Sequence, residues 1–589
     1  MKQMIQLIEN AVESAFSDSD YDKKYGKVTL SNRPDLCEFQ CNGALAAAKE
    51  YKTAPIRIAE KVAEVLQTQE MFESVEAVKP GFLNFKLSKS FLTEYLNTMY
   101  RSDKFGFEKN GEMRTIMIDY GGPNVAKPLH VGHLRAAIIG ESLKRISRFV
   151  GHNVIGDVHL GDWGFQMGLI ITELAKRKPE LPYFDDTFEG DYPKEAPFTI
   201  SELEEIYPYA SAKSKEDETY KEAALAATYE LQQGRRGYRA IWQHIIQISV
   251  TDLKKNYEKL QVTFDLWKGE SDAQPYIPDM VHKMKEEGYA YISDGALVVD
   301  VKEETDTKEV PPCMILKSDG ASLYNTTDLA TIIWRMKEYH PDKIQYVVDK
   351  RQDLYFTQVF RCARKTGLVE EDTKLQFIGF GTMNGKDGKP FKTRAGGVMR
   401  LESLLNEIEE QMYQKISENA TMSDAEARNT AKIVALSAVK YGDLSNQASK
   451  DYVFDVERFT SFEGNTGPYI LYTIVRIKSI LGKYENMTGA EAQFTGIPQA
   501  QSESQKALML KLSEFSSVVE TAFLESAPHK VCAYIYELSN ALNRFYHETK
   551  ILATENENLQ KGYLSLLILT KNILELCIDL LGFTAPEKM

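Results

Sequence analysis

The sequence predicts a multidomain protein in which an α/β domain with a parallel sheet and a helical insertion lies between a small N-terminal α+β domain and a C-terminal all-α helix bundle. Three observations support this prediction. The chain has 589 residues, more than one hydrophobic core usually holds. Short apolar strands alternate with helices in the middle of the chain. Beyond Leu401 the apolar residues follow a helical period only.

The first domain is expected to span residues 1–105. Apolar residues at helical spacing predict helices over 3–16, 44–52 and 55–67, the last opened by Pro55. Alternating apolar residues predict a strand over 81–87. A charged segment with glycines, residues 102–111, then marks a boundary.

The second domain is expected to span residues 106–400. Strands are predicted at 115–119, 153–159, 344–348 and 375–380 with helices between them. This alternation is typical of a parallel sheet covered on both faces. A helix-rich insertion interrupts it at about residues 175–262.

The third domain, residues 401–589, is expected to be helical throughout. Helices are predicted over 423–441, 468–484, 502–524, 529–552 and 563–581.

The net charge of the chain does not indicate a polyanionic partner. There are 71 basic and 85 acidic residues, a formal charge of −14. The excess is local, because residues 178–230 contain 14 acidic and 5 basic residues. The rest of the chain is close to neutral, so an anion-binding surface elsewhere is compatible with the composition.

The cysteine pattern and the hydropathy exclude several classes of protein. The six cysteines are Cys37, Cys41, Cys313, Cys362, Cys532 and Cys577. They have neither zinc-site spacing nor the density of a disulfide framework. No stretch of about 18 uncharged apolar residues occurs, and the N-terminus lacks the pattern of a secretion signal. We expect reduced thiols, no structural zinc, no membrane partner and a cytoplasmic location.

The first strand of the second domain runs into a turn rich in glycine and histidine, Tyr120-Gly-Gly-Pro-Asn-Val-Ala-Lys-Pro-Leu-His130-Val-Gly-His133. Gly132 lets the backbone approach a phosphate, and the following helix offers unpaired N–H groups. His130 and His133 can donate hydrogen bonds to charge that grows on an attacked phosphate. The alternative is structural, with one histidine capping the helix and the other packed against the sheet.

Together with three further motifs, this turn resembles the arginyl-tRNA synthetases, a family of class I aminoacyl-tRNA synthetases. The four segments are Pro123-Asn-Val-Ala-Lys-Pro-Leu-His-Val-Gly-His-Leu-Arg135, Gly161-Asp-Trp-Gly-Phe-Gln166, Lys317-Ser-Asp-Gly-Ala-Ser-Leu-Tyr324 and Glu463-Gly-Asn-Thr-Gly-Pro-Tyr469. The resemblance implies a Rossmann-type catalytic domain. It also implies ATP-dependent activation of L-arginine to arginyl-adenylate, then transfer to the 3′-terminal adenosine of tRNA(Arg), with AMP and pyrophosphate released. The first step would require bound tRNA.

The resemblance further implies a second phosphate-handling loop, which in class I enzymes carries two lysines. In Gly385-Lys-Asp-Gly-Lys-Pro-Phe-Lys-Thr-Arg-Ala-Gly-Gly397, Thr393 takes the place of the second lysine. Lys127 is then implied as the substitute cation. The implied catalytic residues are Lys127, His130, His133 and Arg394, and the implied ATP-binding residues are Pro123, Gly132, Lys389, Lys392 and Thr393. Taken alone, the loop would be better explained as a solvated basic segment; its place after a sheet strand and beside His130 favours the phosphate role.

A guanidinium is a planar cation with five donors, and selecting it requires carboxylate or phenolic acceptors. Asp119 ends the first strand, while Tyr324 and Asp328 lie four residues apart at the start of a helix. The resemblance assigns the guanidinium to these three residues, and the amino-acid end of arginine to Asn124 and Gln352. Alternatively, Asp328 only favours the helix dipole and Tyr324 belongs to the core. Where the family commonly has Ser-Ser or Ser-Ala, this chain has Gly121-Gly122, so a serine contact is lost.

The C-terminal domain resembles the family's anticodon-binding domain. Tyr469, Tyr472 and Arg476 lie on one helical face, and such side chains commonly stack on splayed bases; ordinary helix packing is the alternative, above all for Tyr472. The N-terminal domain is similar to the additional domain that contacts the outer corner of tRNA. Mg²⁺ is expected to be held mainly by the nucleotide. We expect a monomer that binds tRNA, L-arginine and ATP but not DNA.

Other functions fit the residues less well. A cysteinyl enzyme would need a zinc–thiolate site, and a glutamyl or glutaminyl enzyme a cationic pocket. Small nucleotidyltransferases that use His-x-Gly-His have no need of the long helical tail. The remaining alternative is a catalytically inactive, synthetase-like protein that binds tRNA and acts in regulation.

Overall fold

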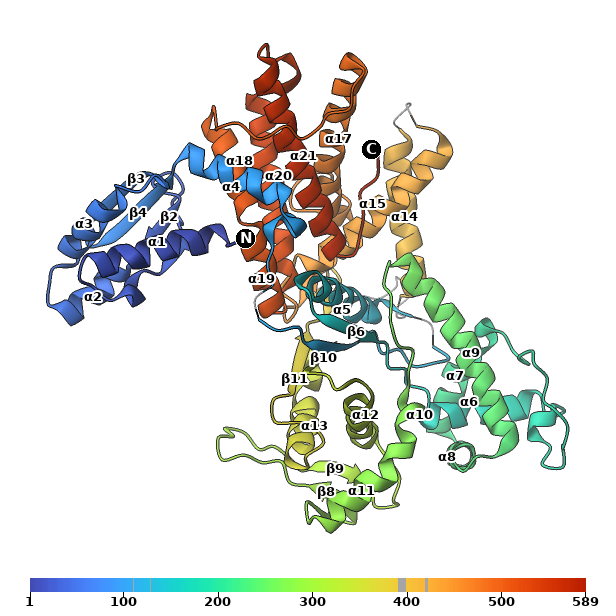
Figure 1. Cartoon of the computed structure of the whole chain (residues 1–589). Coiled ribbons are helices and arrows are strands. Elements are labelled where there is room, and N and C mark those ends of the chain that lie inside the picture. The colour runs from blue at the N-terminus through green and yellow to red at the C-terminus, as the bar shows by residue number, and fades with distance from the viewer. Residues whose placement is uncertain (110, 128, 390–398, 419–421) are drawn as a thin grey trace.

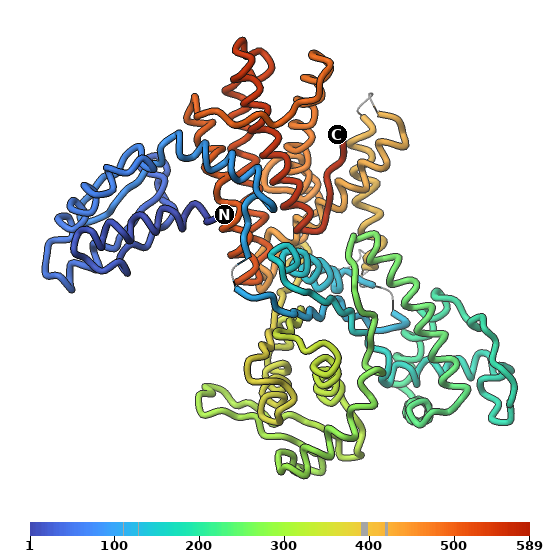
Figure 2. The backbone as a smooth tube through the Cα atoms, viewed as in Figure 1, coloured from blue at the N-terminus to red at the C-terminus, as the bar shows by residue number. Residues whose placement is uncertain are grey.

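The computed structural model describes the chain except residues 110, 128, 390–398 and 419–421. In Figure 1 the N-terminal unit lies at the left, a helical body at the top, and an α/β body below it. A group of helices projects to the right, and the tube in Figure 2 shows that it is an insertion into the α/β body. The predicted fold class is confirmed, since each of its layers is present.

The N-terminal unit is an antiparallel sheet covered by helices. Its elements are α1 (Met4–Asp18), β1 (Val28–Leu30), β2 (Phe39–Cys41), α2 (Gly43–Tyr51), α3 (Pro55–Leu66), β3 (Phe72–Val78) and β4 (Phe82–Leu87), with strand order β1-β2-β4-β3. The three predicted helices and the predicted strand, β4, are all found. On β4, Leu83, Phe85 and Leu87 are buried, which is the alternation the sequence shows. Helix α4 (Lys89–Arg101) leaves this unit and packs on the helical body.

The α/β body is built on a four-stranded parallel sheet of order β11-β10-β5-β6. Its strands are β5 (Thr115–Tyr120), β6 (Asn153–Asp157), β10 (Lys343–Asp349) and β11 (Lys374–Phe380). The principal helices around it are α5 (Val131–Val150), α12 (Tyr324–Tyr339) and α13 (Asp353–Lys365). All four predicted strands are present, and parallel pairing brings their carboxyl ends to one edge.

A second, three-stranded antiparallel sheet was not predicted. It consists of β7 (Ala290–Ser293), β8 (Ala296–Val299) and β9 (Cys313–Leu316), and it packs with α10 (Glu270–Ala273), α11 (Ile277–Glu286) and α12. Asp294 and Gly295 have positive φ values of 48° and 81°, which is the geometry of a tight Asp-Gly hairpin turn. The Asp-Gly pair of this turn could be read from the sequence. The strands that it joins were not predicted, because each is only four residues long.

The insertion is formed by four helices, α6 (Phe165–Arg177), α7 (Ile200–Glu216), α8 (Glu218–Gln232) and α9 (Arg236–Lys259). Helix α6 packs against both α7 and α8. Helix α7 begins with a capping box, in which Thr199 and Glu202 each bond the other's backbone N–H. The acidic stretch is thus a folded part of the chain.

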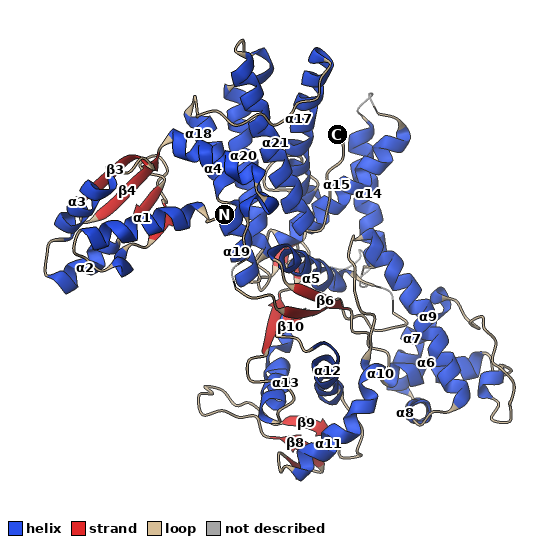
Figure 3. Cartoon of the chain, in the orientation of Figure 1, coloured by secondary structure: helices blue, strands red, loops and turns tan. Residues whose placement is uncertain are grey.

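The C-terminal part is a helical body. Its helices are α14 (Leu401–Ser417), α15 (Asp424–Leu444), α16 (Val456–Phe459), α17 (Gly467–Thr488), α18 (Glu503–Ser513), α19 (Phe515–Leu524), α20 (Pro528–Glu548) and α21 (Glu557–Leu580). Figure 3 shows how fully helices dominate this part. One short strand, β13 (Tyr452–Val453), pairs with β12 (Met383–Asn384) of the α/β body. Within the described parts of the chain, no helix is long and apolar enough to cross a membrane.

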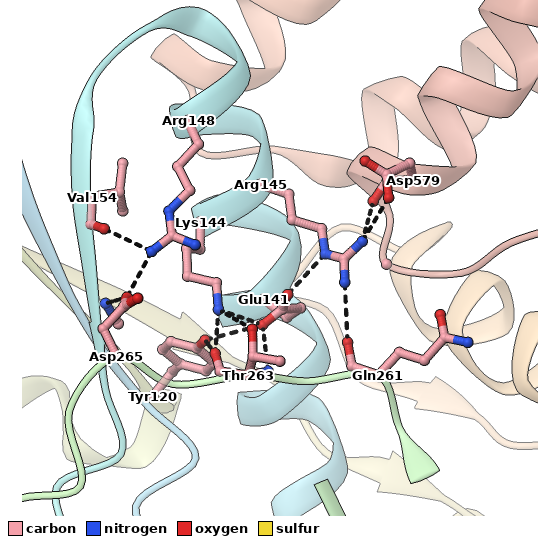
Figure 4. A network of polar contacts seen from close by, with 12 residues as sticks. Tyr120, Glu141, Lys144, Arg145, Arg148, Val154, Gln261, Thr263, Asp265 and Asp579 are labelled. Carbon is pink, nitrogen blue, oxygen red and sulfur yellow. Dashed lines mark hydrogen bonds and ion pairs between the residues drawn. The ribbon is translucent and has the colours of Figure 1, made fainter. Parts of the chain in front are cut away.

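A buried ionic network joins α5 to the helical body (Figure 4). Glu141 is 1% exposed and forms ion pairs of 2.8 Å with both Lys144 and Arg145. Arg145 also reaches Asp579 at the end of α21, at 2.8 Å. Tyr120, the last residue of β5, donates its hydroxyl to Glu141 at 3.1 Å. Helix α5 is therefore fixed on one side to the sheet and on the other to the C-terminal helices.

Candidate active site

A cavity of about 550 Å³ opens at the carboxyl ends of β5, β10 and β11. Among the predicted site residues, its lining includes Asp119, His130, Gly132, His133 and Gln352. The sheet edge supplies the other side, through residues 347–349 and 380–383. This is the edge at which open α/β sheets bind nucleotides, so the histidine turn lies where its chemistry requires.

His130 and His133 cap helix α5 and at the same time face the cavity. The backbone N–H of Gly132 donates to Nδ1 of His130 at 3.1 Å, and the N–H of His130 donates to Nδ1 of His133 at 3.3 Å. The two rings lie 4.0 Å apart. Because each Nδ1 accepts a hydrogen bond, the ring proton of each neutral imidazole must be on Nε2. Capping, the structural alternative, is thus present, and it fixes the tautomer that presents an N–H donor.

Burial keeps both rings uncharged at neutral pH. Burial and the nearby charge of Lys127 lower the pKa of His130. Burial, reinforced by His130, lowers the pKa of His133 to about 3. At neutral pH the pair can therefore offer hydrogen bonds from neutral rings but no positive charge.

The chain that follows the second phosphate loop runs beside this turn. The N–H of Val131 donates to the carbonyl of Met399 at 3.1 Å, and the N–H of Leu401 donates to the carbonyl of Leu129 at 2.9 Å. Lys389 lies just before the residues that are not described. Its carbonyl accepts a hydrogen bond from the N–H of Gly385 at 2.8 Å, which closes a turn. Lys392, Thr393 and Arg394 lie outside the described residues.

A second cavity of about 530 Å³ lies between the α/β body and the insertion. The predicted site residues Asn124, Lys127 and Tyr324 line it, together with Glu270 and Tyr207 of α7. Tyr324 is 66% exposed and is therefore no core residue. Pro123 is buried beside Asn124, and its carbonyl accepts from the N–H of Gly161 at 3.1 Å.

Two neighbouring, partly buried carboxylates, Glu270 in the lining of this cavity and Asp328 close to it, have no basic partner within 4 Å among the described residues. Burial, together with the negative charges of Asp328 and Asp162, raises the pKa of Glu270 to about 8. Burial also raises the pKa of Asp328, with Asp119 adding to the effect. Asp328 accepts a hydrogen bond of 2.5 Å from the hydroxyl of Tyr355. Neighbouring, partly buried acids of this kind favour the entry of a cation, because a positive charge lowers the cost of ionising both.

Asp119 has an internal partner. Its Oδ2 accepts from Nη2 of Arg335 at 2.6 Å, and the same nitrogen donates to Asp157 at 2.7 Å. Arg335 is fully buried. Asp119 therefore already binds one guanidinium, that of the protein itself, and it lines the first cavity rather than the second. Gln352 is exposed and also lines the first cavity only.

The three residues predicted to contact tRNA share a face of α17. Tyr472 is 41% exposed, and Arg476 lies over its ring at 4.9 Å and over that of Tyr546 at 5.4 Å. Tyr469 is half-buried and donates to Asn540 at 2.7 Å. The face thus presents an exposed aromatic ring beside a cation held in place.

Sequence reasoning missed Glu270, Tyr355 and Arg335. Glu270 lies more than a hundred residues from the histidine turn, and it is one of 85 acidic residues. A bridge between Leu160 and Gly269 brings it to the site. Arg335 belongs to α12, and it meets Asp119 and Asp157 only because that helix packs against the sheet. No local sequence pattern therefore indicates its role.

Three sequence families match this chain over successive segments. They are the arginyl-tRNA synthetase N-terminal domain over residues 2–87, the catalytic domain of class I tRNA synthetases (R) over 96–456, and the DALR anticodon-binding domain over 470–589. Arginine–tRNA ligases of Agathobacter rectalis and Alkaliphilus oremlandii are 68% and 58% identical to the chain, each over the full length of both sequences.

Solved structures agree with this on the fold. Arginyl-tRNA synthetase from Plasmodium falciparum superposes with a TM-score of 0.81 at 24% identity, and that from Thermus thermophilus with 0.79 at 23%, both with full coverage of each chain. At 24% and 23% identity, these superpositions show that the fold is shared. The similarity of sequence over the whole length confirms the resemblance, and the chain belongs to the arginyl-tRNA synthetase family of class I synthetases.

Proposed function

We propose that this chain is an arginine–tRNA ligase, which activates L-arginine with ATP and transfers it to the 3′-terminal adenosine of tRNA(Arg). The observation that carries the proposal is the pair of partly buried acids, Asp328 and Glu270, which have no basic partner among the described residues. Glu270 lines the same cavity as Asn124 and Lys127, which precede His130 in the turn. A planar cation fits such a pair better than any neutral side chain does.

For the first step, the carboxylate of arginine attacks the α-phosphate of ATP in line, and pyrophosphate leaves. The Nε2–H groups of His130 and His133 stabilise the charge that develops on the phosphate, and Lys127 adds a positive charge. Gly132 and Pro123 shape the ATP side of the turn. On the sequence pattern, Lys389, Lys392, Thr393 and Arg394 handle the pyrophosphate.

For arginine binding, Asp328, Glu270 and the hydroxyl of Tyr324 are proposed to hold the guanidinium. Asn124 and Gln352, which line the second and the first cavity respectively, remain the proposed ligands of the α-amino end. Asp119 is retained as a contributor to the negative field of the pocket, since its charge reaches Asp328 while its own oxygen is bonded to Arg335.

Mg²⁺ is proposed to enter with ATP. The first cavity is lined by His130 and His133, and its two carboxylates, Asp119 and Asp349, are each paired with an arginine of the chain. The ion would therefore be held by phosphate oxygens and water, where it neutralises charge on the leaving pyrophosphate.

The flanking parts are proposed to bind tRNA. Residues 401–589 would read the anticodon, with Tyr469, Tyr472 and Arg476 stacking on bases. Residues 1–105 would contact the outer corner of the tRNA. Residues 106–400 would hold the catalytic site, and we propose that one monomer suffices.

The test is charging of unfractionated tRNA with labelled arginine. Acid-precipitable label that depends on ATP and on arginine, and that is not formed with lysine or citrulline, supports the proposal. Binding of tRNA without any charging would instead favour the inactive, regulatory alternative and would overturn it.

A further inference from the structure

Helix α7 of the acidic insertion contacts the active site through two residues three positions apart, Glu204 and Tyr207. Positions with this spacing lie on one helical face. The ring of Tyr207 lies under Nζ of Lys127 at 4.5 Å. The carboxylate of Glu204 pairs with Nη2 of Arg400 at 2.8 Å, and Arg400 forms a backbone bridge with His130. One face of α7 thus touches both the lysine and the chain beside the histidine turn.

The type of group that holds Lys127 decides whether its positive charge is neutralised or stays available to a ligand. Among the described residues, no carboxylate lies within 4 Å of its ammonium group, whereas many other lysines of the chain have such a partner. A carboxylate would fix the position of the ammonium group but would also neutralise it. The face of an aromatic ring attracts the cation through its quadrupole and leaves the positive charge available to a phosphate.

We propose that Tyr207 is a positioning residue for Lys127, so that the acidic insertion supplies part of the adenylation site. The inference rests on the proposed function, because it assigns a role to the lysine that acts on the α-phosphate. Glu204, 12% exposed at its side chain, supports the same arrangement by tying α7 to the backbone next to His130. Tyr207 itself does not react.

The experiment compares Tyr207→Leu, Tyr207→Phe and the wild-type chain in arginine-dependent pyrophosphate exchange with tRNA present. Removal of the ring is expected to lower kcat by about 2- to 30-fold, the range of cation–π strengths. Tyr207→Phe keeps the ring and is expected to retain nearly full activity. Tyr209→Leu is the matched control, since Tyr209 belongs to the same helix, is 51% exposed and stacks with Arg177 instead.

A double-mutant cycle separates positioning from a structural role. In a Lys127→Met background, Tyr207→Leu is expected to have no further effect on kcat, whereas a merely structural loss would multiply with that of Lys127. Wild-type rates for Tyr207→Leu, equal losses for the leucine and phenylalanine variants, or multiplicative losses in the cycle would each overturn the inference. Failure of the proposed function is distinguishable, because the wild-type chain would then show no arginine-dependent exchange.

Discussion

The ionisation state of single residues sets the chemistry of this site. The histidines are neutral donors whose tautomer is fixed by backbone N–H groups. Burial and the charges of Asp328 and Asp162 raise the pKa of Glu270 to about 8, and burial together with Asp119 raises the pKa of the neighbouring Asp328. A site with such acids favours a cation, since a nearby positive charge stabilises the ionised form that burial disfavours.

The first prediction concerns the guanidinium contact of Glu270. Glu270→Gln removes a charge while keeping the shape, and the loss of one partner from a buried charged pair costs about 2–4 kcal/mol. We expect kcat/KM for arginine to fall roughly 30- to 1,000-fold, mainly through KM, as measured by steady-state charging. Glu287→Gln is the matched control, because Glu287 is exposed at the end of α11 and does not line the second cavity. Equal kinetics for the two variants would remove Glu270 from the site.

The second prediction concerns pH. The pKa of Glu270 is raised from 4.5 to about 8, so below pH 8 the free protein holds a proton that arginine binding must expel. Arginine affinity is expected to weaken as pH falls below 8, by up to about tenfold per unit, and Glu270→Gln should flatten the profile. Calorimetric titration in buffers of different ionisation enthalpy measures the released proton. Without ligand, the same shift lowers folding stability as pH rises from 4.5 towards 8, because the native state binds the extra proton there.

At the scale of elements, the N-terminus of α5 combines helix capping with the proposed catalytic role of the two histidines in one turn. Gly132 is part of that geometry, because a Cβ at this position would lie 2.8 Å from Cε1 of His130 and 2.9 Å from its Nδ1. The ring that presents the donor and the backbone that fixes it cannot both stay in place if the glycine is replaced.

The third prediction follows from this crowding. Gly132→Ala is expected to lower pyrophosphate exchange by more than about tenfold, within the range for losing one donor to a developing charge, while the melting temperature changes little. Gly482→Ala in α17 is the control, since an added methyl group meets no atom within 4 Å there. Exchange at wild-type rates in Gly132→Ala would show that the ring position is not critical.

Periodicity was sufficient to predict the elements that lead to the site. Strand–helix alternation predicted all four strands of the parallel sheet, and the helical C-terminal part followed from its 3.6-residue period. Periodicity did not predict strands β7, β8 and β9, because a strand of four residues is too short to show a clear alternation. From the residues alone, the site was predictable only where its members are close in the sequence, as in the histidine turn; Tyr324 and Asp328 were assigned to it by the family resemblance. Glu270, Tyr207 and Arg335 arrive from distant helices, and only packing brings them together.

At the scale of the whole molecule, the network around Glu141 decides how firmly α5 is attached to the helical body (Figure 4). The fourth prediction is that Glu141→Gln destabilises the fold by about 3–5 kcal/mol, because Lys144, 1% exposed, would keep a buried charge without its carboxylate. Chemical denaturation monitored on the α/β body measures this. Glu557→Gln breaks an exposed pair with Lys561 and should change stability by less than about 1 kcal/mol. Similar losses for both variants would contradict the role of the network.

The fifth prediction concerns communication across the molecule. Helix α5 carries His130 and His133 at its first turn and packs against α15, α19, α20 and α21 along its length. A tRNA that binds the helical body and restricts its motion would therefore also restrict the motion of α5. The positions of His130 and His133, the proposed phosphate donors, would then be better defined. We expect arginine-dependent pyrophosphate exchange to increase about 5- to 150-fold on addition of tRNA(Arg), the usual range of coupling between two sites. Periodate-oxidised tRNA, which cannot be charged, should stimulate equally well, because ordering and not transfer is the cause. Equal exchange rates with and without tRNA would show that the donors are already in place in the free enzyme, and that α5 transmits nothing.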